Sequence, residues 1–347
     1  MSLRDVSLKA HLYVGLAAAV FLAVAGGTGA ILAFETDYDR WLHPSLWYVT
    51  PRDARRPEEA LLKHVEAQFA PARVEEINVE SPRIAHVFTL TNGHRVFVDP
   101  YEDLIRGERP GISRVEAMGW FVERLHVGLM AGPFGRWFVD VGTAAVMLLI
   151  PTGLVLWWRR RQWRVGWAAS WRRVSWDLHN TIGLYGCVTL LILCVTGLLL
   201  ASDDALLWIT RTSPWRVPPL PRSVLPDPPR TRLDLDQLAL AADRALPASP
   251  TYAIRLPMRE RSPVQFLKHA GGGGRSTVFV DEYAGTILRV DDFSALPGGY
   301  RAHELVRAIH TGDVFGTPTR ILMTLSSLGL VSLVVTGTFI WWRKVIG

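Results

Sequence analysis

Four long apolar runs constrain the fold of this 347-residue chain more than any other feature. They cover residues 12–34, 137–158, 182–201 and 321–342. Each is long enough to cross the hydrocarbon core of a bilayer, which is about 30 Å thick and needs about 20 apolar residues in a helix. Hydrophobic residues make up 49% of the chain, which is too apolar for an ordinary soluble enzyme. We therefore expect an α-helical membrane protein with four transmembrane helices.

The first run is too long for the apolar core of a signal peptide, about 7 to 15 residues, so we expect it to be retained. Basic residues near the ends of the runs predict the orientation, because positive charge stays on the cytoplasmic side. They are Arg4 and Lys9, then Arg159, Arg160, Arg161, Arg164, Arg172 and Arg173, and finally Arg343 and Lys344. Both termini are therefore expected in the cytoplasm. The net charge of +6 reflects this topology and gives no reason to expect a nucleic-acid partner.

The runs divide the chain into seven segments. We expect a first transmembrane helix at 1–35, an extracytoplasmic domain at 36–125, a lead-in helix with the second transmembrane helix at 126–160, a basic cytoplasmic loop at 161–178, a third transmembrane helix at 179–203, a second extracytoplasmic domain at 204–305, and a lead-in helix with the fourth transmembrane helix at 306–347. The cysteines, Cys187 and Cys194, both lie in the third helix, so the outer domains are held by packing without a disulfide.

Internal repetition is the most informative pattern. At a constant offset of 168, His11, Gly15 and Thr28-Gly29 recur as His179, Gly183 and Thr196-Gly197. At a constant offset of 184, His126, Arg136 and Thr152-Gly153 recur as His310, Arg320 and Thr336-Gly337. The outer segments repeat too: "EEALLKHVEAQF" and "LDQLALAADRAL" have helical patterns, and each precedes a "VFVD" run. The chain reads as a duplicated unit of helix, α/β domain and helix.

The repeated histidines fall into two layers on this topology. His11 and His179 begin outward-running helices near the cytoplasmic face, whereas His126 and His310 precede inward-running helices near the outer face. Two imidazoles at one depth are the axial ligands of a b-type haem, and the metal explains polar rings at the edge of a bilayer. Covalent attachment of the c type is excluded because the chain has no C-x-x-C-H. We expect His11 and His179 to hold an inner haem iron and His126 and His310 an outer one.

Glycines and arginines at repeated positions complete the predicted cofactor sites. A porphyrin packs against a helix where side chains are missing, and Gly15, Gly183, Gly29, Gly197, Gly153 and Gly337 lie at the levels of the histidines. The alternative is that these glycines only allow close helix packing. Arg136 and Arg320 lie at the outer ends of the inward-running helices, where they would bind haem propionates or, alternatively, anchor the helices at the interface.

The sequence alone leaves the roles of two residues undecided. His303 lies two turns before His310 on the same helix face, as an alternative ligand or a contact to a haem edge. Asp140 lies one turn into the second span and has no charged counterpart in the repeat. It is either an interfacial acid or a proton site.

The chain resembles the PepSY-associated transmembrane family, which includes iron-regulated inner-membrane proteins and ferric-siderophore reductases. The resemblance rests on "HLYVG", "HNTIG", "LHVG" and "IHTG", on the helix ends from "TG" to "WWR", and on the two "VFVD" segments. It implies a bacterial inner membrane, four membrane helices and two periplasmic PepSY-like domains, and resemblance to the reductase branch implies haem and electron export. With the two histidine layers, we expect two haem b. The family's "DPxTG"-like ending has become "DPYED" and "DEYAG" here.

Two haems stacked across the membrane predict a membrane-bound oxidoreductase that carries electrons outward, and the resemblance implies a ferric-siderophore reductase with a ferric siderophore as acceptor. No flavin or nicotinamide motif is found, so the electron donor is expected to be a quinol or a separate cytoplasmic reductase. A non-redox PepSY-type binding or regulatory membrane protein is the alternative. A transporter is disfavoured because the centres of the four runs carry no charge.

Overall fold

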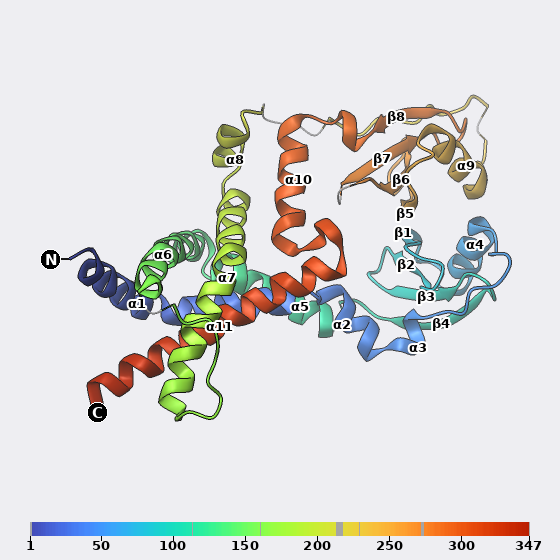
Figure 1. Ribbon diagram of the computed structural model, residues 1–347. Coiled ribbons are helices and arrows are strands. Elements are labelled where there is room, and N and C mark those ends of the chain that lie inside the picture. Colours follow the sequence, from blue (N-terminus) through green and yellow to red (C-terminus); the bar gives the residue numbers. More distant parts are fainter. Residues whose placement is uncertain are drawn as a thin grey trace. The chain divides into compact units, whose positions relative to one another are not determined.

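The computed structural model describes residues 2–112, 114–159, 161–212, 218–228, 230–271 and 274–346 (Figure 1). Arg160, one of the basic residues that predict the orientation, lies outside these ranges. The chain forms two compact units. The bundle unit contains Met1–Glu35, Met118–Arg211 and Leu305–Gly347, and the sheet unit contains Thr36–Ala117 and Thr212–Glu304. Both halves of the chain therefore contribute to each unit.

Four helices form the core of the bundle unit. They are α1 (Leu3–Leu32), α6 (Gly132–Trp158), α7 (Trp171–Ala201) and α11 (Thr317–Ile346), and among the described residues these are the helices long and apolar enough to cross a membrane. The prediction of four spanning helices is confirmed. Helix α7 begins well before residue 182, because backbone hydrogen bonding continues the helix into polar sequence beyond the apolar run. Helices α1 and α7 each contact both α6 and α11, so the four helices form a closed ring.

A short helix precedes each of the two returning spans. Helix α5 (Arg114–Gly128) leads into α6, and α10 (Gly298–Thr311) leads into α11. The chain breaks between them at residues with positive φ, which include Gly132 in the first junction and Gly312 and Gly316 in the second. Glycine adopts this conformation without steric cost. The helix α8 (Asp203–Thr210) follows α7, and the helices α2 (Glu35–Leu42) and α3 (Pro44–Trp47) follow α1.

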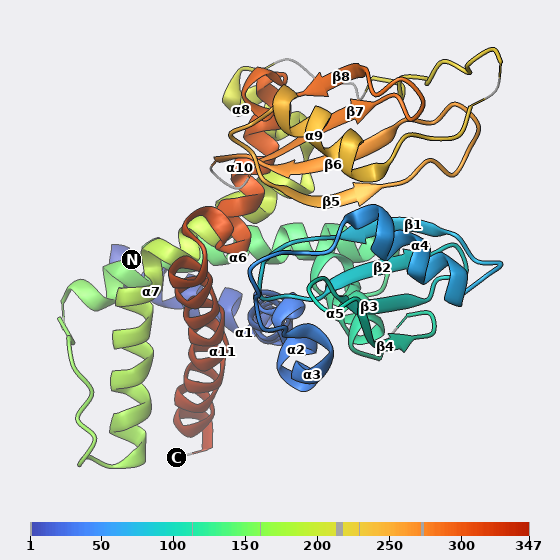
Figure 2. The same cartoon turned by 90° about the vertical axis from the view of Figure 1, so that its right-hand side faces the viewer.

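The sheet unit contains one antiparallel sheet with the strand order β4-β3-β2-β1-β5-β6-β7-β8 (Figures 1 and 2). The first half of the chain contributes β1 (Val74–Asn78), β2 (His86–Leu90), β3 (Arg95–Asp99) and β4 (Leu104–Arg109), and the second half contributes β5 (Thr251–Arg255), β6 (Val264–His269), β7 (Arg275–Val280) and β8 (Ile287–Asp291). The two predicted outer domains thus share a single eight-stranded sheet. Strands β1 and β5 pair because an unpaired strand edge leaves its N–H and C=O groups available to another strand.

Two helices cover one face of this sheet. Helices α4 (Glu58–Gln68) and α9 (Leu235–Ala245) match the two helical patterns of the sequence. Their apolar residues, among them Leu61 and Leu238, pack with Phe88 and Phe266 of the sheet in one fully buried core. The second face of the β2–β3 region is covered by a smaller cluster around Trp47 and Phe97. Both cysteines are free and lie in α7, so no disulfide holds this unit, as expected from the sequence.

Carboxylates cap the two covering helices reciprocally. Asp236 of α9 accepts hydrogen bonds from the N–H groups of Glu58 and Glu59 at the start of α4, at 2.9 and 3.1 Å. Glu59 of α4 accepts one from the N–H of Leu235 at the start of α9, at 3.0 Å, and two from the Arg232 guanidinium, at 3.0 and 2.8 Å. Negative charge at a helix N-terminus is favourable, so each helix stabilises the other.

We predict that Glu59→Gln lowers the free energy of unfolding of the sheet unit by about 2 kcal/mol, the worth of a hydrogen-bonded charge. Burial alone would raise the pKa of Glu59, but the Arg232 guanidinium and the Leu235 N–H outweigh it and lower this pKa. A lowered pKa contributes stability above the unfolded-state value, near 4.3, that is lost as the pH falls through the folded-state value. The thermal midpoint of the full chain in nanodiscs, followed between pH 7 and acid, should therefore depend less on pH in the variant.

The exposed Glu75 on β1 provides the control for this test. Glu75→Gln removes a carboxylate of the same type without a buried guanidinium partner, and it should leave the thermal midpoint within error. Equal midpoints and equal pH profiles for wild type and Glu59→Gln would contradict the assigned capping role.

Candidate functional site

Two pairs of histidines face each other in the bundle unit. The ring centroids of His11 on α1 and His179 on α7 are 6.2 Å apart. Those of His126 on α5 and His310 on α10 are 6.3 Å apart. We call the first pair the terminal layer, because His11 lies near the N-terminus and His179 contacts Thr336 near the C-terminus. We call the second pair the lead-in layer, because its histidines lie on the lead-in helices. From His11 to Thr28, which contacts His126, helix α1 rises about 25 Å at 1.5 Å per residue, so the layers lie far apart in the bundle.

Each histidine is held by the hydroxyl of a threonine on another helix. In the terminal layer, His11 Nδ1 lies 3.0 Å from Thr152 Oγ1 and His179 Nδ1 lies 3.0 Å from Thr336 Oγ1. In the lead-in layer, the corresponding distances are 2.9 Å for His126 to Thr28 and 2.9 Å for His310 to Thr196. The four threonines are the first residues of the repeated Thr-Gly pairs. Every spanning helix therefore carries one Thr-Gly pair, and each pair contacts one histidine; we call these pairs the TG clamps.

The direction of these hydrogen bonds decides which ring nitrogen carries the proton. Each threonine hydroxyl also donates to the backbone carbonyl four residues earlier in its own helix. The distances are 2.6 Å for Thr28 to Val24, 2.8 Å for Thr152 to Leu148, 2.6 Å for Thr196 to Ile192 and 2.7 Å for Thr336 to Ser332. A hydroxyl has one proton, so a hydroxyl that donates to its own helix carbonyl accepts from the imidazole. The hydrogen-bond network thus favours an Nδ1–H tautomer, which leaves the Nε2 lone pair available as a ligand.

The glycine of each TG clamp makes room for the imidazole. A Cβ atom built on the glycine would lie 3.1 Å from His11 Cε1 at Gly153, 3.0 Å from His179 Cε1 at Gly337, 3.3 Å from His126 Cε1 at Gly29 and 3.2 Å from His310 Cε1 at Gly197. These glycines therefore contact the histidine rings themselves. Gly15 and Gly183 differ, because a Cβ there would meet Leu149 at 3.8 Å and Leu333 at 3.6 Å, which is ordinary packing distance.

The ring spacing of both pairs matches that of one metal ion between two imidazoles. With metal–nitrogen bonds of about 2 Å, the two Nε2 atoms lie about 4 Å apart, and each ring centroid lies about 1 Å behind its nitrogen. The resulting centroid separation of about 6 Å agrees with the 6.2 and 6.3 Å of the two layers. No group of three or more His, Cys, Asp or Glu side chains suited to a metal occurs in the described part of the chain. A two-histidine site suits a metal whose other ligands come from a macrocycle, as in a bis-histidine haem.

Apolar side chains fill the bundle between the two layers. Leu22 of α1, Val146 of α6 and Cys194 of α7 are buried there, together with partly buried residues that include Leu330 of α11. Such packing excludes water and lowers the local dielectric, so a charge on either layer would be weakly screened. Both histidine layers are thus enclosed by a largely apolar bundle.

The two repeated arginines have different surroundings. Arg320 donates from Nε and Nη2 to the carbonyl of Ala33, at 2.9 and 2.6 Å, and its guanidinium lies 4.5 Å from the ring centre of Phe34. It therefore joins the start of α11 to the end of α1. Arg136 is exposed near the start of α6. The repeat therefore predicts equivalent positions in sequence but does not produce equivalent contacts.

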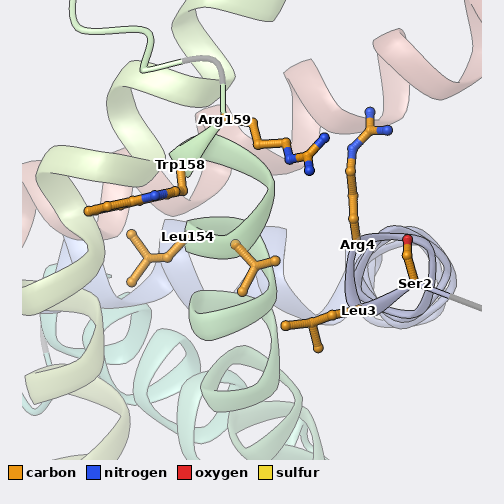
Figure 3. A pocket seen from close by; sticks show the side chains of 7 residues that line it. Ser2, Leu3, Arg4, Leu154, Trp158 and Arg159 are labelled. Atoms are coloured by element: carbon orange, nitrogen blue, oxygen red, sulfur yellow. The ribbon is translucent and has the colours of Figure 1, made fainter.

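The remaining polar candidates, His303 and Asp140, lie on α10 and α6. His303 Nδ1 is 3.8 Å from Glu304 Oε1 in α10, and Asp140 is partly exposed on α6. A groove of about 720 Å³ between the start of α1 and the end of α6 is lined by Ser2, Leu3, Arg4, Leu154, Val155, Trp158 and Arg159 (Figure 3). Figure 3 shows the guanidinium groups of Arg4 and Arg159 on one side of this groove and the indole of Trp158 turned away. Arginine and tryptophan are common where spans meet the membrane surface.

The arrangement of four spans with paired histidines can be compared with known families. The sequence profile of the PepSY-associated TM region matches residues 8–344, which include both histidine layers and all four TG clamps. The chain belongs to the PepSY-associated TM family. No curated protein matches it significantly. The family assignment confirms the resemblance found in the sequence and, with the four apolar helices, describes a membrane protein whose surroundings are a lipid bilayer.

The threonines of this PepSY-associated protein are the site residues that sequence reasoning missed. The internal repeat reveals the Thr-Gly pairs, but it does not indicate a function for the threonine hydroxyl. The signal was available, because Thr-Gly occurs once per span at the same two offsets as the histidines. What the repeat could not predict is which clamp meets which ring, since the partners lie 98 to 157 residues apart in sequence.

Proposed function

We propose that this protein is a di-haem b reductase of the bacterial inner membrane. It carries electrons from a quinol or a cytoplasmic reductase to a periplasmic acceptor, ferric iron in a siderophore. The observation that carries the proposal is the pair of histidine layers, with ring centroids 6.2 and 6.3 Å apart and Nδ1 of every ring engaged by a threonine. Polar rings are costly inside a membrane bundle unless they serve a ligand or a path for charge.

Each residue of the two layers has a role in this proposal. His11 and His179 hold the inner iron through Nε2, and His126 and His310 hold the outer one. When bound, haem supplies a one-electron couple between ferrous and ferric iron. The threonines hold the proton on Nδ1, and the apolar side chains between the layers keep water out of the bundle. Arg136 and Arg320 remain candidates for the propionates, with Arg136 the more accessible of the two.

The direction of electron flow follows from the proposed topology, with both termini in the cytoplasm. An electron that moves outward leaves the negative side of the membrane, which is favourable by about 2.3 kcal/mol per 100 mV. Reduction of the ferric iron to the ferrous state weakens its binding by hard oxygen donors, so the siderophore releases it. The siderophore rests on the family resemblance, which names this class of substrate.

A duplication of a helix, α/β domain, helix unit is proposed as the origin of the two similar layers. Both halves have the order of spanning helix, covering helix, four strands, lead-in helix and spanning helix. Ile77 of β1 pairs with Ile254 of β5 at the centre of the sheet, and the flanking pairs are Glu76–Arg255 and Asn78–Ala253. The covering helices α4 and α9 are also equivalent elements of the two halves, and a carboxylate of each caps the other. Duplication of one unit accounts for two histidine layers that are built in the same way.

Absorption spectroscopy of the purified full chain tests this proposal. Expressed with haem available and extracted in mild detergent, the protein should bind two haem b per chain and change its visible spectrum on reduction with dithionite. In proteoliposomes loaded with a reductant, it should reduce an external ferric siderophore, whereas empty liposomes should not. Colourless protein with no bound iron porphyrin would overturn the proposal and favour the non-redox binding or regulatory role.

A further inference from the structure

We propose that Thr28, Thr152, Thr196 and Thr336 are positioning residues that fix the tautomer and the ring orientation of the four histidines, and thereby set the reduction potentials of the irons these rings hold. The inference rests on the proposed function for the irons. The assignment of the tautomer rests on the hydrogen bonds alone. The two parts can therefore be tested separately.

Each threonine hydroxyl is oriented by its own helix, independently of the histidine. Each threonine donates to the carbonyl of its own preceding turn, at 2.6 to 2.8 Å, and this bond selects one χ1 rotamer. The neighbouring glycine leaves room for the ring, because a Cβ built there would lie 3.0 to 3.3 Å from Cε1. A ring bound by a fixed oxygen on Nδ1 and packed beside a glycine at Cε1 has little freedom to rotate. The TG clamp is therefore a positioning device with two parts.

The hydroxyl also affects the electron density that the ring offers a metal. An acceptor at Nδ1–H raises the basicity of Nε2, and a more basic ligand favours the ferric state. Without the hydroxyl, Nδ1–H lies buried without this partner, and the ferric state loses stabilisation. The midpoint potential of the affected iron should therefore rise when the hydroxyl is removed.

Ring orientation differs between the two layers. The planes of His11 and His179 are 86° apart, whereas those of His126 and His310 are 52° apart. The relative orientation of two axial imidazoles changes the splitting of the iron d orbitals, so the two ferric centres should give distinct electron paramagnetic resonance signals. The near-perpendicular terminal layer should give the more anisotropic signal.

Isosteric variants separate the hydroxyl from the shape of the side chain. Thr152→Val and Thr336→Val remove the hydroxyls of the terminal layer, and Thr→Ser at the same positions restores them. Thr143 of α6 and Thr324 of α11 are matched controls, because they make the same bond to the carbonyl four residues earlier, at 2.7 and 2.8 Å, and no histidine hydrogen bond to them is found among the described residues. The full chain is compared in nanodiscs by redox titration, paramagnetic resonance and the rate of haem transfer to an acceptor protein.

We expect the valine variants to raise the midpoint potential of one haem only, to change its resonance signal, and to speed its loss about 10- to 100-fold, the usual cost of removing a contact to a ligand. The serine variants should recover the wild-type values, and Thr143→Val and Thr324→Val should match them throughout. Unchanged potential, signal and haem loss in both valine variants would overturn the positioning role.

Nitrogen-15 spectra of the histidines distinguish failure of this inference from failure of the proposed function. In wild-type protein prepared without haem, the Nδ1–H tautomer should dominate at the four clamped rings and should be mixed in the valine variants. An Nε2–H tautomer in the wild type would overturn the inference even if two haems bind. An Nδ1–H tautomer in protein that never binds haem would leave the clamp intact and refute only the proposed function.

Discussion

Replacement of His11 or His179 with alanine is expected to reduce the haem content from two per chain to one and to stop electron transfer across the membrane. Under the proposed function, both rings of the layer, whose centroids are 6.2 Å apart, would hold one iron, so loss of either ring should release that haem. His126→Ala or His310→Ala should remove the other haem. Haem per chain from a pyridine haemochrome assay, together with reduction of an external ferric siderophore by proteoliposomes, measures both effects.

The pattern across variants is more informative than any one loss. Variants of one layer should retain the same haem, and a double variant with one alanine in each layer should retain none. His94→Ala, in the sheet unit beside Glu108, is the control and should keep two haems. Retention of both haems in all four single variants would rule out these histidines as ligands.

Alanine at Gly337 is expected to displace the His179 ring and weaken the terminal layer. The new Cβ would lie 3.0 Å from His179 Cε1, closer than ordinary packing, and Thr336 Oγ1 holds the same ring at 3.0 Å. The ring cannot retreat without stretching that bond, so the overpacking costs about 1–3 kcal/mol. Alanine at Gly153, Gly197 and Gly29 should have a similar effect, because the corresponding distances are 3.1 to 3.3 Å. Haem content and haem loss rates of the four variants check this expectation.

Two glycines outside the clamps provide controls for this series. A Cβ at Gly27 of α1 would have no neighbour within 4 Å, and one at Gly186 of α7 would meet only Leu190, at 3.6 Å. Gly27→Ala and Gly186→Ala add the same methyl group to the same two membrane helices as the clamps of the lead-in layer. Their haem content should equal that of the wild type. Equal losses in clamp and control variants would point to general helix packing instead of contact with the rings.

Local sequence predicted the elements of this protein well. A helix of about twenty apolar residues can cross a bilayer because its backbone hydrogen bonds are formed within the segment, so four spans could be predicted without tertiary information. The junctions ahead of α6 and α11 were also predictable, because glycine and proline act on the backbone at their own positions. The constant offsets of the histidines predict pairs at two depths.

Tertiary structure decided which groups meet. The joining of β1 and β5 into one sheet depends on two strand edges far apart in the chain, and the exposed Arg136 and the bound Arg320 show that equal positions in a repeat receive unequal neighbours. The same holds for the clamps. Sequence determined that each span carries a Thr-Gly pair and that four histidines repeat with them. Only packing of the helices could place Thr152 against His11 rather than another ring, since a hydrogen bond of 3.0 Å depends on position in space and not on distance along the chain.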